Sequence, residues 1–314
     1  MALIMSDVDR FEAARPRLEA IAYRLLGSSG EAEDAVQETF LRWQAADAGR
    51  IEVPEAWLTK VLTNFCLNQL TSARARRETY VGRWLPEPLL AGDTMLGPAD
   101  TAEQRESVSY AVLVLLERLS PKERAVYVLR EAFDYPHREI AEILDITEAA
   151  GQQIYHRAKK HVAEGRARTE VDEAAARRIV EEFLAAATSG RTEPLVRLLT
   201  QDAVSVGDGG GKIPARAKAF EGAQAVATFL RGLFKPGDAK RKYVGGAPDV
   251  YATTANGEPA IVAVVDGRVV GITCLEVTAE GIVAVRSQVN PDKLVRATRQ
   301  WAAMDHGEGP LHTL

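Results

Sequence analysis

The chain of 314 residues contains 46% hydrophobic and 26% charged residues, proportions that exclude a wholly disordered or collagen-like protein. At about 150 residues per domain, the length allows about two domains. The 39 Lys and Arg are outnumbered by 44 Asp and Glu, and the net charge of -5 excludes a chain-wide basic surface for nucleic acid. Any such function must come from local patches.

The two cysteines, Cys66 and Cys274, lie far apart in apolar stretches, which predicts neither a disulfide framework nor a cysteine-based zinc site. No segment approaches the ~18 uninterrupted apolar residues of a membrane span, and the first ten residues carry acids without an apolar signal core. We therefore expect a cytoplasmic protein with no metal and no cofactor.

The first eighty residues predict three amphipathic helices. Apolar residues recur at three- and four-residue steps from 11 to 26, and the GSSG at 27–30 ends this helix. Ser28 and Glu31 have the spacing of a capping box for a second, acidic helix that runs to about Trp43. Pro54 suits the first position of a third helix, which ends in a cationic run.

Two of these helices carry candidate surfaces. Glu33, Asp34, Gln37 and Glu38 of the second helix cannot favour DNA, so they indicate either a protein partner with a basic surface or plain solvent contact. The cationic end of the third helix can hold DNA phosphates while amides meet exposed bases, the alternative being a solvated helix end. The residues of this second surface are Asn64, Asn68, Arg74, Arg76, Arg77 and Arg83.

Residues 82–100 predict a linker, because they hold three prolines and three glycines without helical periodicity. A second helical block follows at about 102–168. Within it, 137–162 predicts a helix-turn-helix: two apolar stripes separated by a tight break at 145–147. The second helix displays groups that can read base edges and contact phosphates, although an ordinary αα-hairpin with a basic solvated face is the alternative. These groups are Gln152, Gln153, Tyr155, His156, Arg157, Lys159 and Lys160.

Gly151 precedes these groups. A glycine near the start of a helix costs about 1 kcal/mol of helix propensity, so it marks either a close backbone approach or a loosened helix.

Beyond Asp172 the pattern changes to α+β. One helix is followed by Gly-rich turns and β-branched runs, and Asp266-Gly267 between two such runs predicts a two-residue hairpin in a mostly antiparallel sheet. The residues from about Gly307 have the composition of a frayed tail.

The third part shows little sign of catalysis. No histidine lies between 172 and 305, which removes the commonest acid-base residue. Lys212 is followed by Ile213 instead of Ser or Thr, so the glycines before it do not form a nucleotide phosphate loop. Two alternatives stay open: an enzyme that uses Asp202 or Asp208 as base, and a regulator whose cavity binds a small ligand without turnover.

The segments AEDAVQETFLRW (32–43) and WLTKVLTNFCLNQLTSARARR (57–77), with residues 119–162, resemble a bacterial RNA polymerase sigma factor of the extracytoplasmic-function (ECF) type. The resemblance implies that the loop 47–55 and the helix 57–77 bind the melted -10 element, and that the recognition helix binds the -35 element. Asn68 and Thr71 depart from the family's frequent DxLR pattern, which bears on the fine promoter preference. The residues implied to bind core polymerase are Asp34, Gln37, Glu38 and Phe40.

The remainder resembles a SnoaL-like domain, a cone-shaped α+β fold related to polyketide cyclases and ketosteroid isomerase. Sigma factors with this extension form a subgroup in which the extension is implied to regulate in cis, without a separate anti-sigma protein. Its three marker motifs are Trp84-Leu85-Pro86-Glu87-Pro88, Asp208-Gly209-Gly210-Gly211-Lys212 and Asn290-Pro291-Asp292-Lys293-Leu294.

The resemblances predict two all-α sigma domains, a helical bundle and a helix-turn-helix, followed by the α+β domain. We expect the first motif to anchor on the other two, so that docking of the third domain shifts the separation of the first two. Truncation before Asn290 should then alter transcription by this monomeric, non-enzymatic protein. The predicted parts are sigma region 2 at 1–81, linker at 82–101, sigma region 4 at 102–168, SnoaL-like domain at 169–300 and tail at 301–314.

Overall fold

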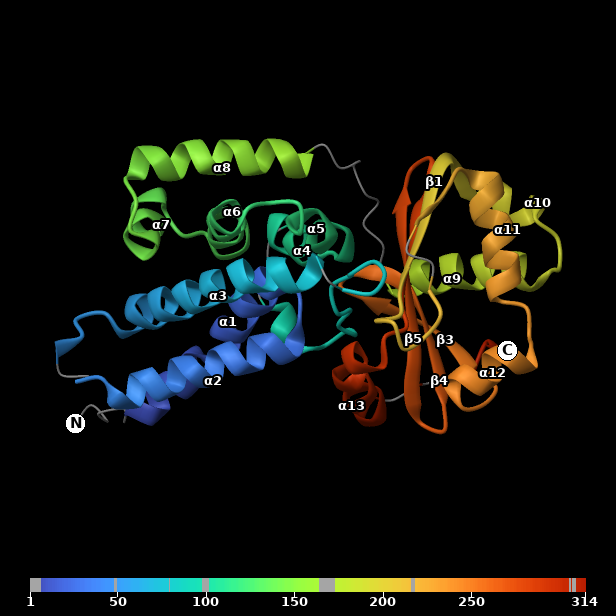
Figure 1. Cartoon of the computed structure of the whole chain (residues 1–314), viewed down its shortest axis with the longest axis horizontal. Helices are drawn as coiled ribbons and strands as arrows, with labels where there is room; N and C mark the ends of the chain where they lie inside the picture. The colour runs from blue at the N-terminus through green and yellow to red at the C-terminus, as the bar shows by residue number, and fades with distance from the viewer. Residues whose placement is uncertain are drawn as a thin grey trace. The chain divides into compact units, whose positions relative to one another are not determined.

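The computed structural model describes residues 7–47, 50–78, 80–97, 102–163, 173–215, 218–304, 306 and 309–314. The chain forms two compact units (Figure 1). The first consists of Met1–Glu78 and Gly92–Gly165, and the second of Thr79–Ala91 and Arg166–Leu314. The linker segment, residues 80–91, is therefore part of the second unit.

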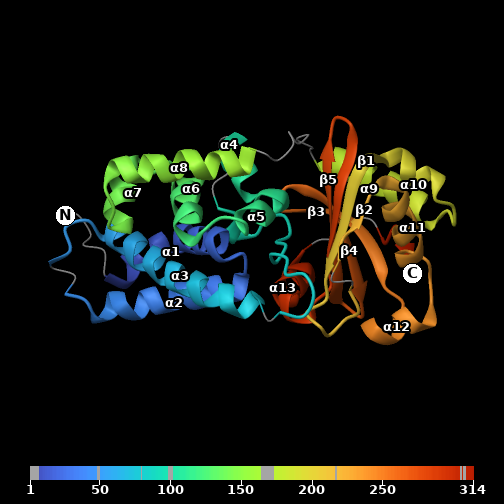
Figure 2. The same ribbon diagram turned by 45° about the horizontal axis from the view of Figure 1, so that its top comes forward.

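In its described residues the first unit is helical, and several of its helices begin at a capping side chain (Figures 1 and 2). The Ser28 side chain accepts the Glu31 N–H at the start of the second helix, and Ser120 with Glu123 forms a complete capping box ahead of Pro121. The three helices predicted before residue 80 are confirmed. The elements are α1 Asp7–Leu26, α2 Ser29–Ala45, α3 Pro54–Glu78, η2 Thr94–Leu96, α4 Ala102–Val108, α5 Tyr110–Leu116, α6 Pro121–Phe133, α7 His137–Leu144 and α8 Glu148–Ala163.

Helices α1, α2 and α3 pack together, while α7 and α8 lie beside α6 (Figure 2). Arg124 of α6 joins the two groups: its buried guanidinium donates to the Leu25 carbonyl at 2.8 Å and to Glu117 at 2.8 Å. Burial lowers the pKa of Arg124 to about 9. The first unit is thus held together partly by a buried cation that needs both partners.

The second unit is the predicted α+β domain, with one seven-stranded sheet in the order β2-β1-β6-β5-β4-β3-β7. Its pairs are antiparallel except β1 with β6. Asp266 and Gly267 form the expected two-residue turn, both at positive φ. The strands are β1 Leu199–Asp208, β2 Phe220–Glu221, β3 Asp249–Ala255, β4 Glu258–Val265, β5 Arg268–Thr278, β6 Gly281–Gln288 and β7 His312–Thr313.

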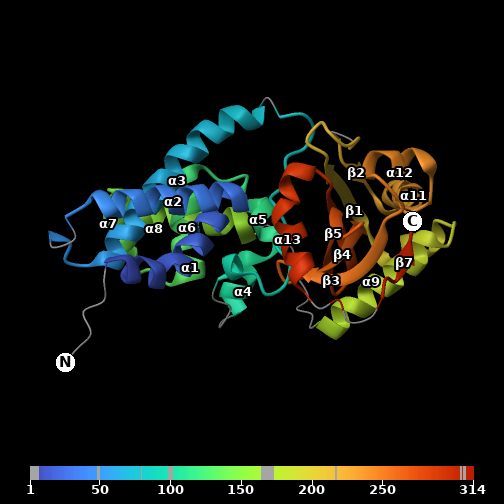
Figure 3. The same ribbon diagram turned by 90° about the horizontal axis from the view of Figure 1, so that it is seen from below.

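Helices α9 and α11 cover one face of this sheet, and α13 lies on the other (Figure 3). Phe183, Phe234, Val250 and Leu275 form part of the core beneath α9 and α11. The opposite face carries buried polar side chains instead, among them the Glu276–Arg286 ion pair at 2.6 Å. The helices of this unit are α9 Glu173–Thr188, α10 Glu193–Leu198, α11 Ala223–Leu233, α12 Asp238–Val244, η3 Pro291–Lys293 and α13 Val295–Ala303.

The end of the chain is more ordered than its composition suggests. Trp301 completes α13, and His312 pairs with Val250 of β3. Without this short strand, β3 would be an edge strand with unpaired backbone groups, so the pairing follows from the sheet and not from local sequence.

Candidate functional site

The linker segment binds the C-terminal domain through its backbone. Leu89 and Asn256 exchange two hydrogen bonds: the Leu89 N–H donates to Asn256 Oδ1 at 2.8 Å, and the Asn256 N–H donates to the Leu89 carbonyl at 2.9 Å. Leu90 forms a β-bridge with Ala255, and the Ala91 N–H donates to the Thr254 carbonyl at 3.3 Å. The segment is thus paired beside the turn that joins β3 to β4.

Asp208, the last residue of β1, is the centre of the contact and is fully buried. Its Oδ1 accepts from the Tyr80 hydroxyl at 2.7 Å and from the Gly210 N–H at 3.0 Å. Its Oδ2 accepts from the Leu85 N–H at 2.9 Å, from Lys293 Nζ at 2.7 Å and from Gln288 Nε2 at 3.3 Å. A buried carboxylate is tolerated only when its oxygens are satisfied in this way, and the linker segment supplies two of these five donors.

Lys293 is as closely tied to the linker as Asp208. Its Nζ donates to the Leu85 carbonyl at 2.7 Å and lies 4.0 Å from the centre of the Trp84 ring, a cation–π distance. The Tyr80 ring lies 5.1 Å from the same ammonium group. Burial, together with the Asp208 carboxylate, raises the pKa of Tyr80, so its hydroxyl stays a donor.

Two amides complete the site. Gln288 Nε2 donates to the Leu85 and Pro86 carbonyls at 3.4 and 3.3 Å, and Asn290 Nδ2 donates to the Tyr80 hydroxyl at 2.9 Å. We call Asp208, Gln288, Asn290 and Lys293 the linker site.

The glycines of the second motif permit this close approach. Gly210 has φ +59°, and a Cβ there would collide with the Asn290 amide. Lys212 and Asp292, from the same two motifs, form an ion pair at 2.6 Å, but their side chains are 55% and 64% exposed. The motif residues thus divide into a buried set that contacts the linker and an exposed pair.

The structure brings the three sequence motifs together. Sequence reasoning did not single out Tyr80, Gln288 or Asn256. Asn256 and Gly257 form an Asn-Gly dipeptide, which indicates a turn from sequence alone. Gln288 lies two residues before Asn290, but nothing local to Tyr80 or Gln288 indicates that the two take part in the contact between the linker segment and the C-terminal domain.

The predicted helix-turn-helix is present as α7 and α8, and its polar side chains divide between two faces. Tyr155 and Lys159 turn toward Glu131 of α6, and Arg157 pairs with Glu123 at 2.8 Å. Burial and the Glu131 carboxylate raise the pKa of Tyr155. The predicted residues that are exposed and lie apart from these contacts with α6 are Gln152, Gln153, His156 and Lys160.

The acidic face of α2 includes an apolar residue that the motif did not indicate. Asp34 and Gln37 are exposed, Glu38 pairs with Arg42 at 2.9 Å, and Leu41 on the same face is 51% exposed. Phe40, in contrast, packs against Phe11, with 4.8 Å between the centres of the two rings.

Most of the predicted -10 surface lies on α3, where Asn64 is half-buried and Asn68 is exposed. Arg83, predicted as part of the same surface, lies instead in the linker segment, where it is exposed. This helix also touches α7 and the loop before it. Lys60 Nζ donates to Asp145 Oδ1 at 2.6 Å, and the Thr59 and Tyr135 hydroxyls lie 2.9 Å apart. The side chains of Arg74, Arg76 and Arg77 lie outside the described part of the structure.

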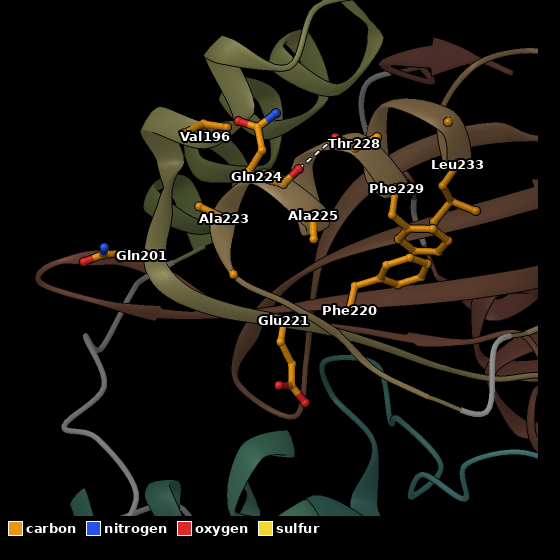
Figure 4. Close-up of a pocket in the computed structure, with 12 residues that line it drawn as sticks. Val196, Gln201, Phe220, Glu221, Ala223, Gln224, Ala225, Thr228, Phe229 and Leu233 are labelled. Carbon is orange, nitrogen blue, oxygen red and sulfur yellow. Dashed lines mark hydrogen bonds between the residues drawn. The ribbon is translucent and has the colours of Figure 1, made fainter.

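Two of the hollows in the C-terminal domain share lining residues. A cavity of about 340 Å³ lies on the α11 side of the sheet. A shallow groove follows α11 and β2 (Figure 4), and Phe220 and Phe229, stacked at 4.2 Å, line both hollows. Neither Asp202 nor Asp208 lines the cavity: Asp202 is exposed, and Asp208 is engaged by the linker segment.

Among the described residues, no three His, Cys, Asp or Glu side chains are placed to hold a metal ion. No helix in the same residues is long and apolar enough to cross a membrane.

Comparison with known proteins identifies the helical unit. The sigma-70 region 2 family matches residues 10–76, and the sigma-70 region 4 family matches 109–162. The chain is 36% identical to the ECF RNA polymerase sigma factor SigJ of Mycobacterium tuberculosis, over 98% of this chain and 99% of that protein. The chain belongs to the ECF sigma factors. The predicted role in transcription initiation is thereby confirmed, and membership implies core RNA polymerase and promoter DNA as partners.

The likeness extends beyond the sigma regions. The probable ECF sigma factor SigI of M. tuberculosis is 32% identical over 92% of this chain and 97% of its own length. The crystal structure of M. tuberculosis SigJ matches with a TM-score of 0.70 at 34% identity, covering 91% of this chain and 97% of that chain. This ECF sigma factor therefore shares its C-terminal domain with its relatives.

Proposed function

We propose that the C-terminal domain regulates this sigma factor in cis by holding the linker segment. The observation that carries the proposal is the burial of Asp208 with two of its five donors supplied by the linker, the Tyr80 hydroxyl and the Leu85 N–H. One residue separates Tyr80 from Glu78, the last residue of α3. A held linker segment therefore restricts how far the region 2 helices can move from the domain that holds it.

The polar character of the site suits reversible contact. The sheet face that carries Gln288 also carries Glu276 and Arg286, so its groups can exchange protein partners for water when the linker leaves. A hydrogen bond contributes only about 0.5–1.5 kcal/mol net, because water replaces the lost partner. An apolar face of the same size would resist release and aggregate once exposed.

Release of the linker segment would allow the two sigma regions to move further apart. Promoter -10 and -35 elements lie about 25 base pairs apart, or roughly 85 Å at 3.4 Å per base pair. Once released, the twelve residues 80–91 could span at most about 40 Å, at about 3.3–3.6 Å per residue. The Lys60–Asp145 contact holds the sigma regions together: it joins α3, proposed to bind the -10 element, to the end of α7, which precedes the helix proposed to bind the -35 element. We propose that this contact must open before both promoter elements can be bound.

Run-off transcription with core RNA polymerase tests the proposal. We expect Asp208→Asn, which removes the charge that holds Lys293 and the linker, to raise transcription above that of the full chain. Lys212→Ala, in the same motif but in the exposed pair, is the matched control and should leave transcription unchanged. A chain ending before Asn290 should resemble Asp208→Asn. Equal transcription by all versions would remove cis regulation while leaving the sigma function intact.

The contact surfaces of the sigma part are proposed as follows. The exposed face of α2 binds core polymerase, and the exposed residues of α8 read the -35 element, since amides and cations there are free to meet base edges and phosphates. The α3 helix binds the melted -10 element. Because residues 1–168 carry more acidic than basic side chains, binding to DNA without polymerase should be weak and salt-dependent.

For the C-terminal domain we propose a role without catalysis. The two carboxylates considered as bases, Asp202 and Asp208, do not line the cavity.

We further propose a cytoplasmic monomer that acts without a separate anti-sigma protein. Light scattering of the purified chain tests the monomer, and co-purification from cells tests for an anti-sigma partner.

A further inference from the structure

The cavity of the C-terminal domain has apolar walls and a cationic rim. Phe229, Phe234, Val250 and Ile261 are among the side chains of its wall. Its floor includes the Thr273 and Ser287 hydroxyls, which lie 3.0 Å apart. Three cations line it as well, while none of its described lining residues is Asp or Glu. The cations are Lys218, Lys235 and Arg241.

Arg241 is the cation whose geometry points to an anion. It lies in the middle of α12, and its Nε is buried without a hydrogen-bond partner. A buried donor left without an acceptor costs about 1–3 kcal/mol, more when the group is charged. Arg241 lines the cavity, so its guanidinium is beside the space that a ligand would occupy. A carboxylate there can accept two parallel guanidinium N–H bonds.

Size and chemistry together define the ligand class. A cavity of about 340 Å³ lies near the lower end of the roughly 300–1,000 Å³ range of small-molecule sites, which favours a small ligand. We infer that this cavity binds a small apolar monocarboxylate, with its hydrocarbon part against the phenylalanines and its carboxylate at Arg241.

The cavity shares two strands with the linker site. Ser205 and Gly207 of β1 line the cavity, and the next residue is Asp208. Ser287 of β6 lines the cavity, and the next residue is Gln288. A ligand that shifts either strand would act on the linker contact. This consequence rests on the proposed cis regulation, whereas ligand binding itself does not.

Calorimetry on the full-length protein tests the inference with three probes of nearly equal size: octanoate, 1-octanol and octylammonium. We expect octanoate to bind one to one and about tenfold or more tighter than 1-octanol, because a hydrogen bond to a charged group adds that much. Octylammonium should bind weakest. This ranking requires no variant, so it does not depend on the folding of one.

Two variants assign the carboxylate site. Arg241→Gln should lower octanoate affinity to that of 1-octanol and leave 1-octanol unchanged. Lys242→Gln, which removes the adjacent exposed charge outside the cavity lining, should keep the preference. Equal binding of the three probes, absence of octanoate binding, or an unchanged preference in Arg241→Gln would overturn the inference. None of these results would touch cis regulation, which the Asp208→Asn transcription assay decides separately.

Discussion

At the scale of single residues, the Asp208–Lys293 pair shows why this contact is specific. Both side chains are at least nine-tenths buried, and Lys293 has the Leu85 carbonyl and the Trp84 ring as further partners. Removing charges from water is costly, and the cost is offset only while every partner is present. The linker segment supplies some of those partners, so its departure weakens the pair itself.

We expect Lys293→Met to lower the free energy of unfolding by about 3–5 kcal/mol, the usual cost of leaving one member of a buried ion pair alone. Asp208→Asn combined with Lys293→Met should cost less than the sum of the single changes, since no unpaired charge then remains. Urea unfolding of the full chain and the three variants measures both effects. Strict additivity would mean that the two groups act independently.

At the scale of elements, the helices proposed to bind DNA or polymerase each use part of their surface for contacts within their own unit. In α8, Arg157 and Lys159 pair with acids of α6, which orients the helix, while the neighbouring Gln153 and Lys160 are exposed. Helix α2 similarly packs Phe40 inward and exposes Leu41. Alternation of inward and outward residues at helical spacing produces both faces from one sequence.

Gly151 of α8 offers a test of helix stability. A Cβ at this position would lie 3.7 Å from Ile146 Cδ1, an ordinary contact. We therefore expect Gly151→Ala to raise the free energy of unfolding by about 0.5–1 kcal/mol, because alanine loses less backbone entropy in a helix. Gly210→Ala should do the opposite, since its Cβ would strike Asn290. Urea unfolding distinguishes the two variants, and a destabilised Gly151→Ala would indicate that the helix tolerates no side chain there.

Leu41 of α2 tests the polymerase surface. Leu41→Ala should weaken binding to core RNA polymerase by about tenfold, since burying a leucine side chain contributes roughly 1.5–3 kcal/mol. Val8→Ala is the control, because Val8 of α1 is exposed to a similar degree, 49% against 51%. Fluorescence anisotropy of the labelled sigma factor with core enzyme gives both affinities. If both substitutions changed the affinity for core enzyme equally, the polymerase contact would lie elsewhere.

At the scale of the whole molecule, the proposed function requires a change of arrangement. The first unit joins α3 to α7 through Lys60 and Asp145, with side chains 40% and 72% exposed. An exposed ion pair contributes only about 0–1 kcal/mol, so this contact is weak enough for polymerase or DNA to break. The stronger restraint lies in the second unit, where the linker segment is held by buried charges.

Opening can be measured with two spin labels on the full chain, at Ser72→Cys in α3 and His161→Cys in α8. Both positions are exposed, and neither belongs to the predicted contact residues. Burial raises the pKa of Cys66 and of Cys274, which keeps these thiols unreactive and leaves the labels selective. We expect the label separation to increase on addition of core polymerase, and to increase without polymerase in Asp208→Asn. A separation unchanged by polymerase would contradict opening.

Much of this protein could be predicted from local sequence. The capped helices, the helix-turn-helix and the Asp266-Gly267 hairpin depend on signals within a few residues of one another, where backbone preference and apolar spacing act directly. The resemblance to known proteins added two further predictions: the sigma factor family, and contact between the three marker motifs. The linker contact that joins those motifs is present in the structure, while their regulatory role stays a prediction.

Long-range contacts decided the rest. No local signal shows that Tyr80 and Gln288 complete the linker site, that Arg157 faces Glu123, or that Arg241 lies at a cavity, because each depends on segments brought together by the sheet or the helix packing. The C-terminal strand is a further case, since it forms only because β3 offers an open edge. The sequence by itself determined which elements form and which family they belong to. The tertiary structure decided which polar groups are buried together, because the energy of burying a charge depends on partners that are distant in the chain.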